Sequence, residues 1–163
     1  MEKDKINLLL VDDEEQFAAS ISKSLEVRGF RVITVDRGEK AIEAARNHPI
    51  DVVLLDLKMP GLSGEETLKV LKKKHKSMEV VILTGHGAID SAIECTKTGA
   101  YSYLQKPCEL NELLESLKNA YKQKVMNTKK IEKKKMNEML KISLSDKPRD
   151  ILRRLREIDK EGG

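Results

Sequence analysis

The sequence contains no tryptophan and few other aromatic residues. Phenylalanine and tyrosine make up 3% of the 163 residues, whereas the hydrophobic share as a whole is 39%. A core of this composition must be built mainly from leucine, isoleucine and valine, which favours buried strands and packed helices. At this length we expect one domain with a sizeable core, because two full domains would each bury too little surface.

Long hydrophobic runs are also missing, and each apolar stretch spans only a few residues. A membrane-spanning helix needs roughly 20 predominantly apolar residues, and a secretory signal needs an apolar segment close to the N-terminus. The charged first five residues and the short apolar run before Asp12 fit neither pattern. We therefore expect a cytoplasmic protein that does not contact a membrane.

Cysteine is rare as well, with only Cys95 and Cys108 in the chain. The two residues form no CxxC pair, and their spacing does not match that of zinc ligands. We expect both to be reduced thiols, as is usual for cysteines of cytosolic proteins. A structural zinc site is not expected.

Charge is divided unevenly along the chain, although the net charge is +4. Residues 1–121 carry 17 basic and 20 acidic side chains, whereas residues 122–163 carry 14 basic and 7 acidic ones. A basic excess is typical of a nucleic-acid surface, but it also occurs on solvated helix faces. We favour the solvated face, because no DNA-binding motif or nucleotide-binding loop follows Tyr121.

Five short apolar runs alternate with segments of helical periodicity. The runs lie at residues 6–11, 31–35, 51–55, 80–83 and 101–104, with helices predicted over residues 14–28, 38–47, 64–74 and 88–97 and after Pro107. This alternation predicts an α/β fold in which helices cover both faces of a parallel sheet. The third run has no polar residue between Val52 and Leu55, as expected of a central strand buried on both sides.

The segment after Tyr121 is predicted as a basic, helical C-terminal extension, residues 122–163, of a domain over residues 1–121. Its basic run at residues 129–135 either prolongs the fifth helix or frays. A further helix is predicted after a capping sequence at residues 145–148. Its apolar stripe from Ile151 to Ile158 needs an apolar partner, which is the main domain, a second copy of the chain or a target protein.

Reactive side chains follow four of the five predicted strands. Asp12 and Asp13 follow the first, Asp56 the third, Thr84 ends the fourth, and Lys106 follows the fifth. In an open parallel sheet, ligands bind at the carboxyl ends of the strands, so these side chains are expected to share one crevice. Taken singly, each also fits a bland role, such as a helix cap, a turn residue or a surface charge.

Three carboxylates in one crevice repel one another unless a cation lies between them. A site made only of oxygen ligands selects a hard ion such as Mg²⁺. A carboxylate can also attack phosphorus when nearby cations neutralise the phosphoryl oxygens. Asp56 is therefore predicted to accept a phosphoryl group, with Lys106 supplying positive charge and Thr84 a hydrogen bond.

These residues belong to longer motifs that occur in a recognisable order. The motifs are Leu10-Val11-Asp12-Asp13-Glu14, residues 56–61 with Gly64, Leu83-Thr84-Gly85-His86-Gly87, and residues 99–107. Over residues 5–121 the chain resembles the response-regulator receiver family of two-component signalling. Its fourth-strand motif is similar to that of receivers of enhancer-binding transcription activators. The resemblance implies a flavodoxin-like, doubly wound sheet of five strands in the order 2-1-3-4-5.

The resemblance also implies a role for each site residue. Asp56 would be the phosphorylation site, and Thr84 and Lys106 would bind the phosphoryl group. Asp13, Asp56 and the backbone carbonyl of Lys58 would contact Mg²⁺ directly, with Asp12 acting largely through water. The Lys106–Pro107 peptide bond would be cis.

The family's switch and its lifetime map onto four residues. Movement of Thr84 would draw Tyr103 inward and change the surface around the fourth helix, fifth strand and fifth helix, although a tyrosine in an edge strand reads equally well as packing. Lys58 and His86 stand where the lifetime of the phosphorylated state is tuned. The direction of their effect is not predicted.

Three functions compete at this point. The favoured one is a switch that receives phosphoryl groups from a histidine kinase or phosphotransfer protein and controls a downstream protein, with no enzymatic activity beyond slow self-dephosphorylation. The second is a DNA-binding transcriptional regulator that uses the basic tail, as a monomer or a homodimer. The third, a metal-dependent phosphatase, lacks support because Lys58 stands where such an enzyme places a second carboxylate.

Overall fold

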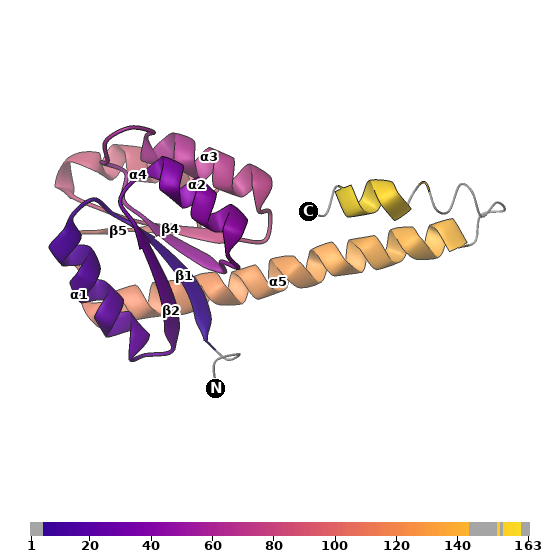
Figure 1. The fold of residues 1–163 in the computed structure, drawn as a ribbon, viewed down its shortest axis with the longest axis horizontal. Coiled ribbons are helices and arrows are strands. Elements are labelled where there is room, and N and C mark those ends of the chain that lie inside the picture. Colours follow the sequence, from indigo (N-terminus) through magenta and orange to yellow (C-terminus); the bar gives the residue numbers. More distant parts are fainter. Residues whose placement is uncertain (1–4, 144–152, 154, 161–163) are drawn as a thin grey trace. The chain divides into compact units, whose positions relative to one another are not determined.

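The computed structural model describes residues 5–143, 153 and 155–160, and its strands and helices alternate along the chain (Figure 1). The elements are β1 (Ile6–Val11), α1 (Glu15–Glu26), β2 (Phe30–Val35), α2 (Gly38–Asn47), β3 (Val52–Leu55), α3 (Gly64–Lys74), β4 (Glu79–Thr84), the short 3-10 helix η2 (His86–Ala88), α4 (Ile89–Lys97), β5 (Ser102–Gln105) and α5 (Leu110–Ser143). The chain divides into two compact units, Met1–Lys124 and Val125–Gly163.

The first unit contains a five-stranded sheet in the order β2-β1-β3-β4-β5, and the strands pair in parallel. The predicted fold and strand order are therefore confirmed. Val11, at the end of β1, is level with Leu55 at the end of β3. Thr84, at the end of β4, is level with Gln105 at the end of β5. This register brings the residues after the strands to one edge of the sheet.

Alternation along the strands divides the core into two apolar layers. Leu9, Val11, Val53 and Leu55 belong to a layer with α2, α3 and α4, whereas Leu8, Leu10, Val52 and Leu54 belong to a layer with α1 and α5. Figure 1 shows these two sets of helices on opposite sides of the sheet. As the composition predicted, both layers are mainly aliphatic, and among the described residues Phe30 is the one fully buried aromatic side chain.

The loops at the carboxyl edge of the sheet end in well-defined helix starts. Ser63 caps α3, because its side chain accepts a hydrogen bond from the amide of Glu66. The fourth predicted helix differs slightly, since His86–Ala88 forms a 3-10 turn and α4 begins at Ile89. At the opposite edge, Gly29 lies in the turn between α1 and β2 with a φ of +95°, a conformation that favours glycine.

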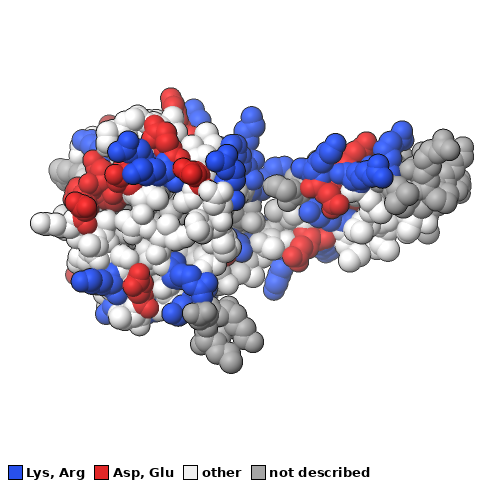
Figure 2. All heavy atoms as spheres, in the orientation of Figure 1, with Lys and Arg blue, Asp and Glu red and all other residues white. Residues whose placement is uncertain are grey.

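In the second unit the basic run of residues 129–135 lies inside α5, so this run prolongs the helix. Figure 2 shows Lys and Arg side chains gathered on its exposed surface. Residues 155–160 form a further helical segment, in which Ile158 is buried. The predicted cap at residues 145–148 and the start of the apolar stripe, Ile151 and Leu152, lie outside the described residues.

None of the helices in the described part of the chain combines the length and the apolar character needed to span a lipid bilayer.

Candidate functional site

The carboxyl edge of the sheet brings three predicted aspartates together. Carboxylate oxygens of Asp12, Asp13 and Asp56 all lie within 4.8 Å of one another. Asp12 and Asp56 are buried, with 3% and 4% of their surface exposed, whereas Asp13 is exposed. The cause is the parallel pairing of β1 with β3, which sets the residues that follow both strands side by side.

Asp56 lies at the centre of this cluster and is held by its neighbours. Its Oδ1 accepts a hydrogen bond from the Thr84 hydroxyl at 2.9 Å and a longer one from the Lys58 amide at 3.2 Å. Its Oδ2 lies 3.5 Å from Nζ of Lys106. Thr84, at the end of β4, is almost fully buried.

Lys106 reaches the cluster from the loop after β5. Its Nζ lies 2.6 Å from Oδ2 of Asp12 and 3.4 Å from Oε1 of Glu14. The ammonium also lies 4.4 Å from the centroid of the Phe17 ring, a cation–π contact from α1. The peptide bond between Lys106 and Pro107 is cis, as the resemblance implied.

The charges of the site do not balance, because one ammonium faces several carboxylates. Burial raises the pKa of Asp12, although hydrogen bonds from Lys106 and from the Glu14 amide oppose this rise. Burial alone would lower the pKa of Lys106, but its hydrogen bond to Asp12 and the nearby charge of Asp56 raise it overall. Both raised pKa values indicate that additional positive charge beside the buried carboxylates would stabilise their ionised form.

The donor set fits a small hard cation. Three carboxylates supply only oxygen ligands, which Mg²⁺ prefers. Ligands on opposite sides of Mg²⁺ lie about 4 Å apart, since each bond is about 2.0–2.1 Å long. Oxygens within 4.8 Å of one another can therefore close around this ion after small side-chain movements.

The remaining predicted residues lie around the cluster or apart from it. The Lys58 side chain reaches the loop after β4, because a Cβ added at Gly87 would lie 2.7 Å from Lys58 Nζ. The side chain of His86 lies outside the described part of the chain. Tyr103 lies on the edge strand β5, is 38% exposed and is not part of the carboxylate cluster.

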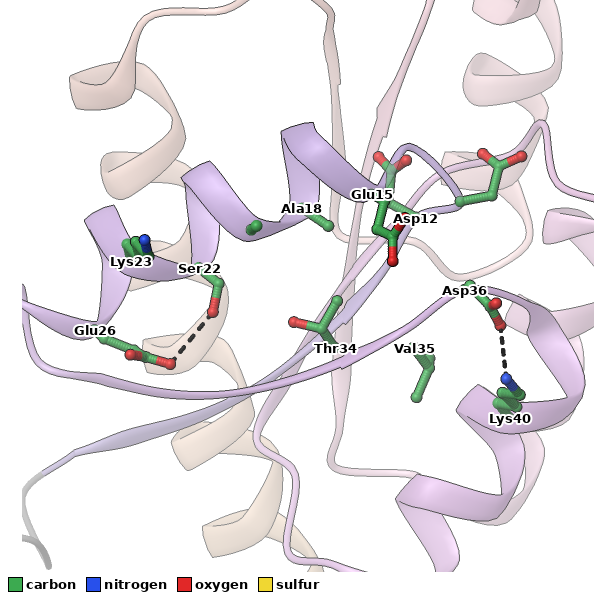
Figure 3. A pocket seen from close by; sticks show the side chains of 12 residues that line it. Asp12, Glu15, Ala18, Ser22, Lys23, Glu26, Thr34, Val35, Asp36 and Lys40 are labelled. Atoms are coloured by element: carbon green, nitrogen blue, oxygen red, sulfur yellow. Dashed lines mark hydrogen bonds and ion pairs between the residues drawn. The ribbon is translucent and has the colours of Figure 1, made fainter.

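A cleft of about 720 Å³ opens beside the cluster, between α1, the end of β2 and the start of α2. Asp12, Asp13 and Asp36 are among the residues that line it, and Figure 3 shows Asp12 and Asp36 on different strand ends around it. Asp36 is paired with both Lys40 and Arg37, each at 3.2 Å. The cleft gives the cluster an open route to solvent.

Comparison with known proteins agrees with this geometry. The family model described as the response regulator receiver domain matches residues 8–118. A receiver domain protein from Clostridium thermocellum has a structure with a TM-score of 0.69 and 38% sequence identity, and the match covers 74% of this chain and 98% of that one.

Two curated relatives are named as transcriptional regulators. The transcriptional regulatory protein ZraR of Klebsiella oxytoca is 34% identical over 120 residues, which is 74% of this chain and 27% of ZraR. The uncharacterized transcriptional regulatory protein YkoG of Bacillus subtilis is 34% identical over 128 residues, which is 78% of this chain and 56% of YkoG. The chain thus spans between about a quarter and about half of the length of these relatives.

Proposed function

Because the chain belongs to the response regulator receiver family of two-component systems, we propose that Asp56 accepts a phosphoryl group from a histidine kinase or phosphotransfer protein in the cytoplasm. One observation carries the proposal: a buried carboxylate lies within reach of a hydroxyl, an ammonium and two further carboxylates at one edge of the sheet. An aspartate that only ended a strand would not require all of these partners.

Mg²⁺ would be held by Asp13, Asp56 and the backbone carbonyl of Lys58, with Asp12 acting through water. When bound, the ion neutralises charge on the incoming phosphoryl oxygens. Asp56 attacks phosphorus through a carboxylate oxygen, and the bond between phosphorus and the donor nitrogen breaks, so that the donor leaves as a free imidazole. The Lys106 ammonium, 3.5 Å from Asp56, is in reach of an oxygen of the transferred group.

The output of this reaction would be a change of surface. Phosphorylation gives the Thr84 hydroxyl a new acceptor in place of the Asp56 oxygen to which it now donates. A shift of Thr84 would allow Tyr103 to move inward and favour a second conformation of α4, β5 and α5, which a partner protein would recognise. Lys58 and His86 would set the lifetime of this state, and no turnover beyond slow self-dephosphorylation is proposed.

The proposal is tested by incubating the chain with acetyl phosphate and Mg²⁺ and measuring its intact mass. We expect one added phosphoryl group on the wild type and none on the Asp56→Ala variant. Multiple turnovers of a small phosphorylated substrate would favour a phosphatase instead, and equal labelling of both proteins would reject Asp56 as the acceptor.

A DNA-binding regulator is the second candidate, and the names of the two curated relatives favour it. The chain itself offers the basic excess of residues 122–163, and Figure 2 shows Lys and Arg side chains, with acidic ones among them, on the surface of the second unit. Salt-dependent retention on arbitrary duplex DNA that disappears when these residues are deleted would support this function. Equal behaviour of the full and the shortened chain would leave protein contact as the output.

A further inference from the structure

Glu39, in the first turn of α2, contacts the loop that joins β3 to α3. Its Oε1 accepts a hydrogen bond of 2.7 Å from the backbone amide of Leu62. Hydrogen bonds from its own amide and from that of Leu62 lower the pKa of the Glu39 carboxyl. The side chain is therefore an ionised acceptor near neutral pH, although it lies at an exposed position.

The contact is close enough to restrict which residues fit on the loop. Gly61 has a φ of +79°, and a Cβ added there would lie 2.8 Å from Oε1 of Glu39. On the helix side, a Cβ added at Gly38 would lie 3.2 Å from the carbonyl oxygen of Leu62. A side chain at Gly38 would collide with the Thr67 hydroxyl of α3 and crowd the Leu62 carbonyl, and the positive φ of Gly61 favours glycine there.

The same loop carries the backbone carbonyl that is proposed to bind Mg²⁺. At its start, the Lys58 amide donates to Asp56. At its end, Ser63 caps α3. Between these ends Lys58, Pro60 and Gly61 are exposed, and Met59 is the residue of this stretch that packs against the core. The Glu39 carboxylate, which comes from α2, hydrogen-bonds to this loop at Leu62, directly before Ser63.

We propose that Glu39 is a positioning residue that braces the β3–α3 loop, so that the Lys58 carbonyl is already placed when Mg²⁺ arrives. The inference rests on the proposed function, because it concerns the same metal. Glu39 does not itself contact the metal or the phosphoryl group. It reduces the ordering that metal binding must otherwise supply, which is how preorganisation increases affinity.

The test measures Mg²⁺ affinity of the unphosphorylated full chain by isothermal titration calorimetry. Loss of one charge-assisted hydrogen bond at an exposed position predicts that Glu39→Ala weakens binding about threefold to tenfold. Glu39→Gln keeps an oxygen acceptor at the same place and should retain most of the affinity. Glu43→Ala is the matched control, because it removes the same charge from the same exposed face of α2 one turn away.

Amide hydrogen exchange provides a readout that does not depend on the metal. In metal-free buffer, peptides that cover residues 57–63 should exchange faster in Glu39→Ala than in the wild type. Their exchange rate should be unchanged in the Glu43→Ala control. If Glu39→Ala exchanged its amides and bound Mg²⁺ like the wild type, the positioning role of Glu39 would be overturned. Equal losses of Mg²⁺ affinity and exchange protection in both alanine variants would also overturn it. A wild-type chain that binds no Mg²⁺ and is not labelled at Asp56 would instead overturn the proposed function.

Discussion

Lys106 lies between two buried carboxylates and an aromatic ring, and it is the internal counter-ion of the site. Its side chain is 13% exposed, and those of its partners Asp12 and Asp56 are 2% and 5% exposed. Removing one partner of such a group leaves the other charges buried without compensation, which costs more than the intact pair contributes.

For this reason we expect Lys106→Met to be destabilised in metal-free buffer. The variant keeps an apolar stem beside Phe17 but removes the ammonium, and the free energy of unfolding should fall by about 1–3 kcal/mol. Added Mg²⁺ should restore part of this loss, because the carboxylates without the Lys106 ammonium bind the cation more tightly, and a cation that binds the folded state stabilises it. Urea unfolding with and without Mg²⁺ measures both effects, with Lys118→Met, an exposed lysine of α5, as the control. If the free energies of unfolding of the wild type and of Lys106→Met differed by the same amount with and without Mg²⁺, this role of Lys106 would be contradicted.

Thr84 offers a second test at the scale of a single side chain. Thr84→Val keeps the shape but removes the hydroxyl that donates to Asp56, whereas Thr84→Ser keeps the donor. We expect the valine variant still to accept a phosphoryl group, at a rate lowered about tenfold to a hundredfold, since a hydrogen bond to a charged group contributes about 1.5–3 kcal/mol. The NMR signals of Tyr103 should not change when the valine variant is phosphorylated, and they should change when the serine variant is phosphorylated. A normal response in the valine variant would remove Thr84 from the switch.

Sequence could predict those site residues that follow strands, and it missed those that come from helices. Asp12 and Asp56 each stand directly after an apolar run and Lys106 stands two residues after one, so strand register alone predicts that they meet. Phe17 reads as one member of the apolar stripe of α1, and nothing in its spacing indicates a contact with Lys106. Glu39 reads as an ordinary acidic residue in a first helical turn. Both contacts depend on how a helix packs on the sheet.

At the scale of elements, α5 is fixed to the sheet at the edge opposite the site. Nζ of Lys124 lies 2.8 Å from Oδ1 of Asp51, which precedes β3. The other oxygen of Asp51 accepts a hydrogen bond of 2.9 Å from the Asn7 amide at the start of β1. One carboxylate therefore connects two central strands with the last turn of α5 in the first unit.

A double-mutant cycle tests this connection. Asp51→Asn and Lys124→Met, measured by urea unfolding singly and together, should show a coupling free energy of about 0.5–1 kcal/mol, the upper part of the range for accessible ion pairs. The Asn7 contact persists in Asp51→Asn, so the cycle isolates the ion pair. A control cycle combines Asp51→Asn with Lys122→Met, which changes an exposed neighbouring lysine, and its coupling free energy should be zero. Equal coupling for both lysines would show only a long-range charge effect.

The elements themselves were largely predictable, because apolar runs and helical stripes have distinct periods. β3 follows from an unbroken apolar run, and the stripe of α5 up to Tyr121 follows from burial against the sheet. Beyond Tyr121 the sequence did not decide between a longer helix and a frayed end, since the basic run lacks an apolar stripe. The structure continues α5 to Ser143, where lysine-rich sequence keeps good intrinsic helix propensity and Ile142 is buried near the end of the helix.

At the scale of the whole molecule, the chain is a receiver unit followed by a second, basic unit. The predicted division into a receiver over residues 1–121 and an extension over residues 122–163 stays a prediction. We expect a chain that ends at Lys124, which keeps the ion pair to Asp51, to unfold cooperatively and to accept a phosphoryl group at the rate of the full chain. Circular dichroism during urea titration and intact mass after labelling measure the two properties. Loss of either in the shortened chain would show that the extension is needed for the fold or the site.

The most direct measurement identifies the residue that carries the phosphoryl group. After treatment with acetyl phosphate, borohydride reduces an aspartyl phosphate to homoserine, which peptide mass spectrometry locates in the sequence. We expect homoserine at position 56 alone, formed with Mg²⁺ and absent when EDTA removes the metal. Homoserine at another aspartate, or equal amounts with and without Mg²⁺, would contradict a metal-assisted transfer to Asp56.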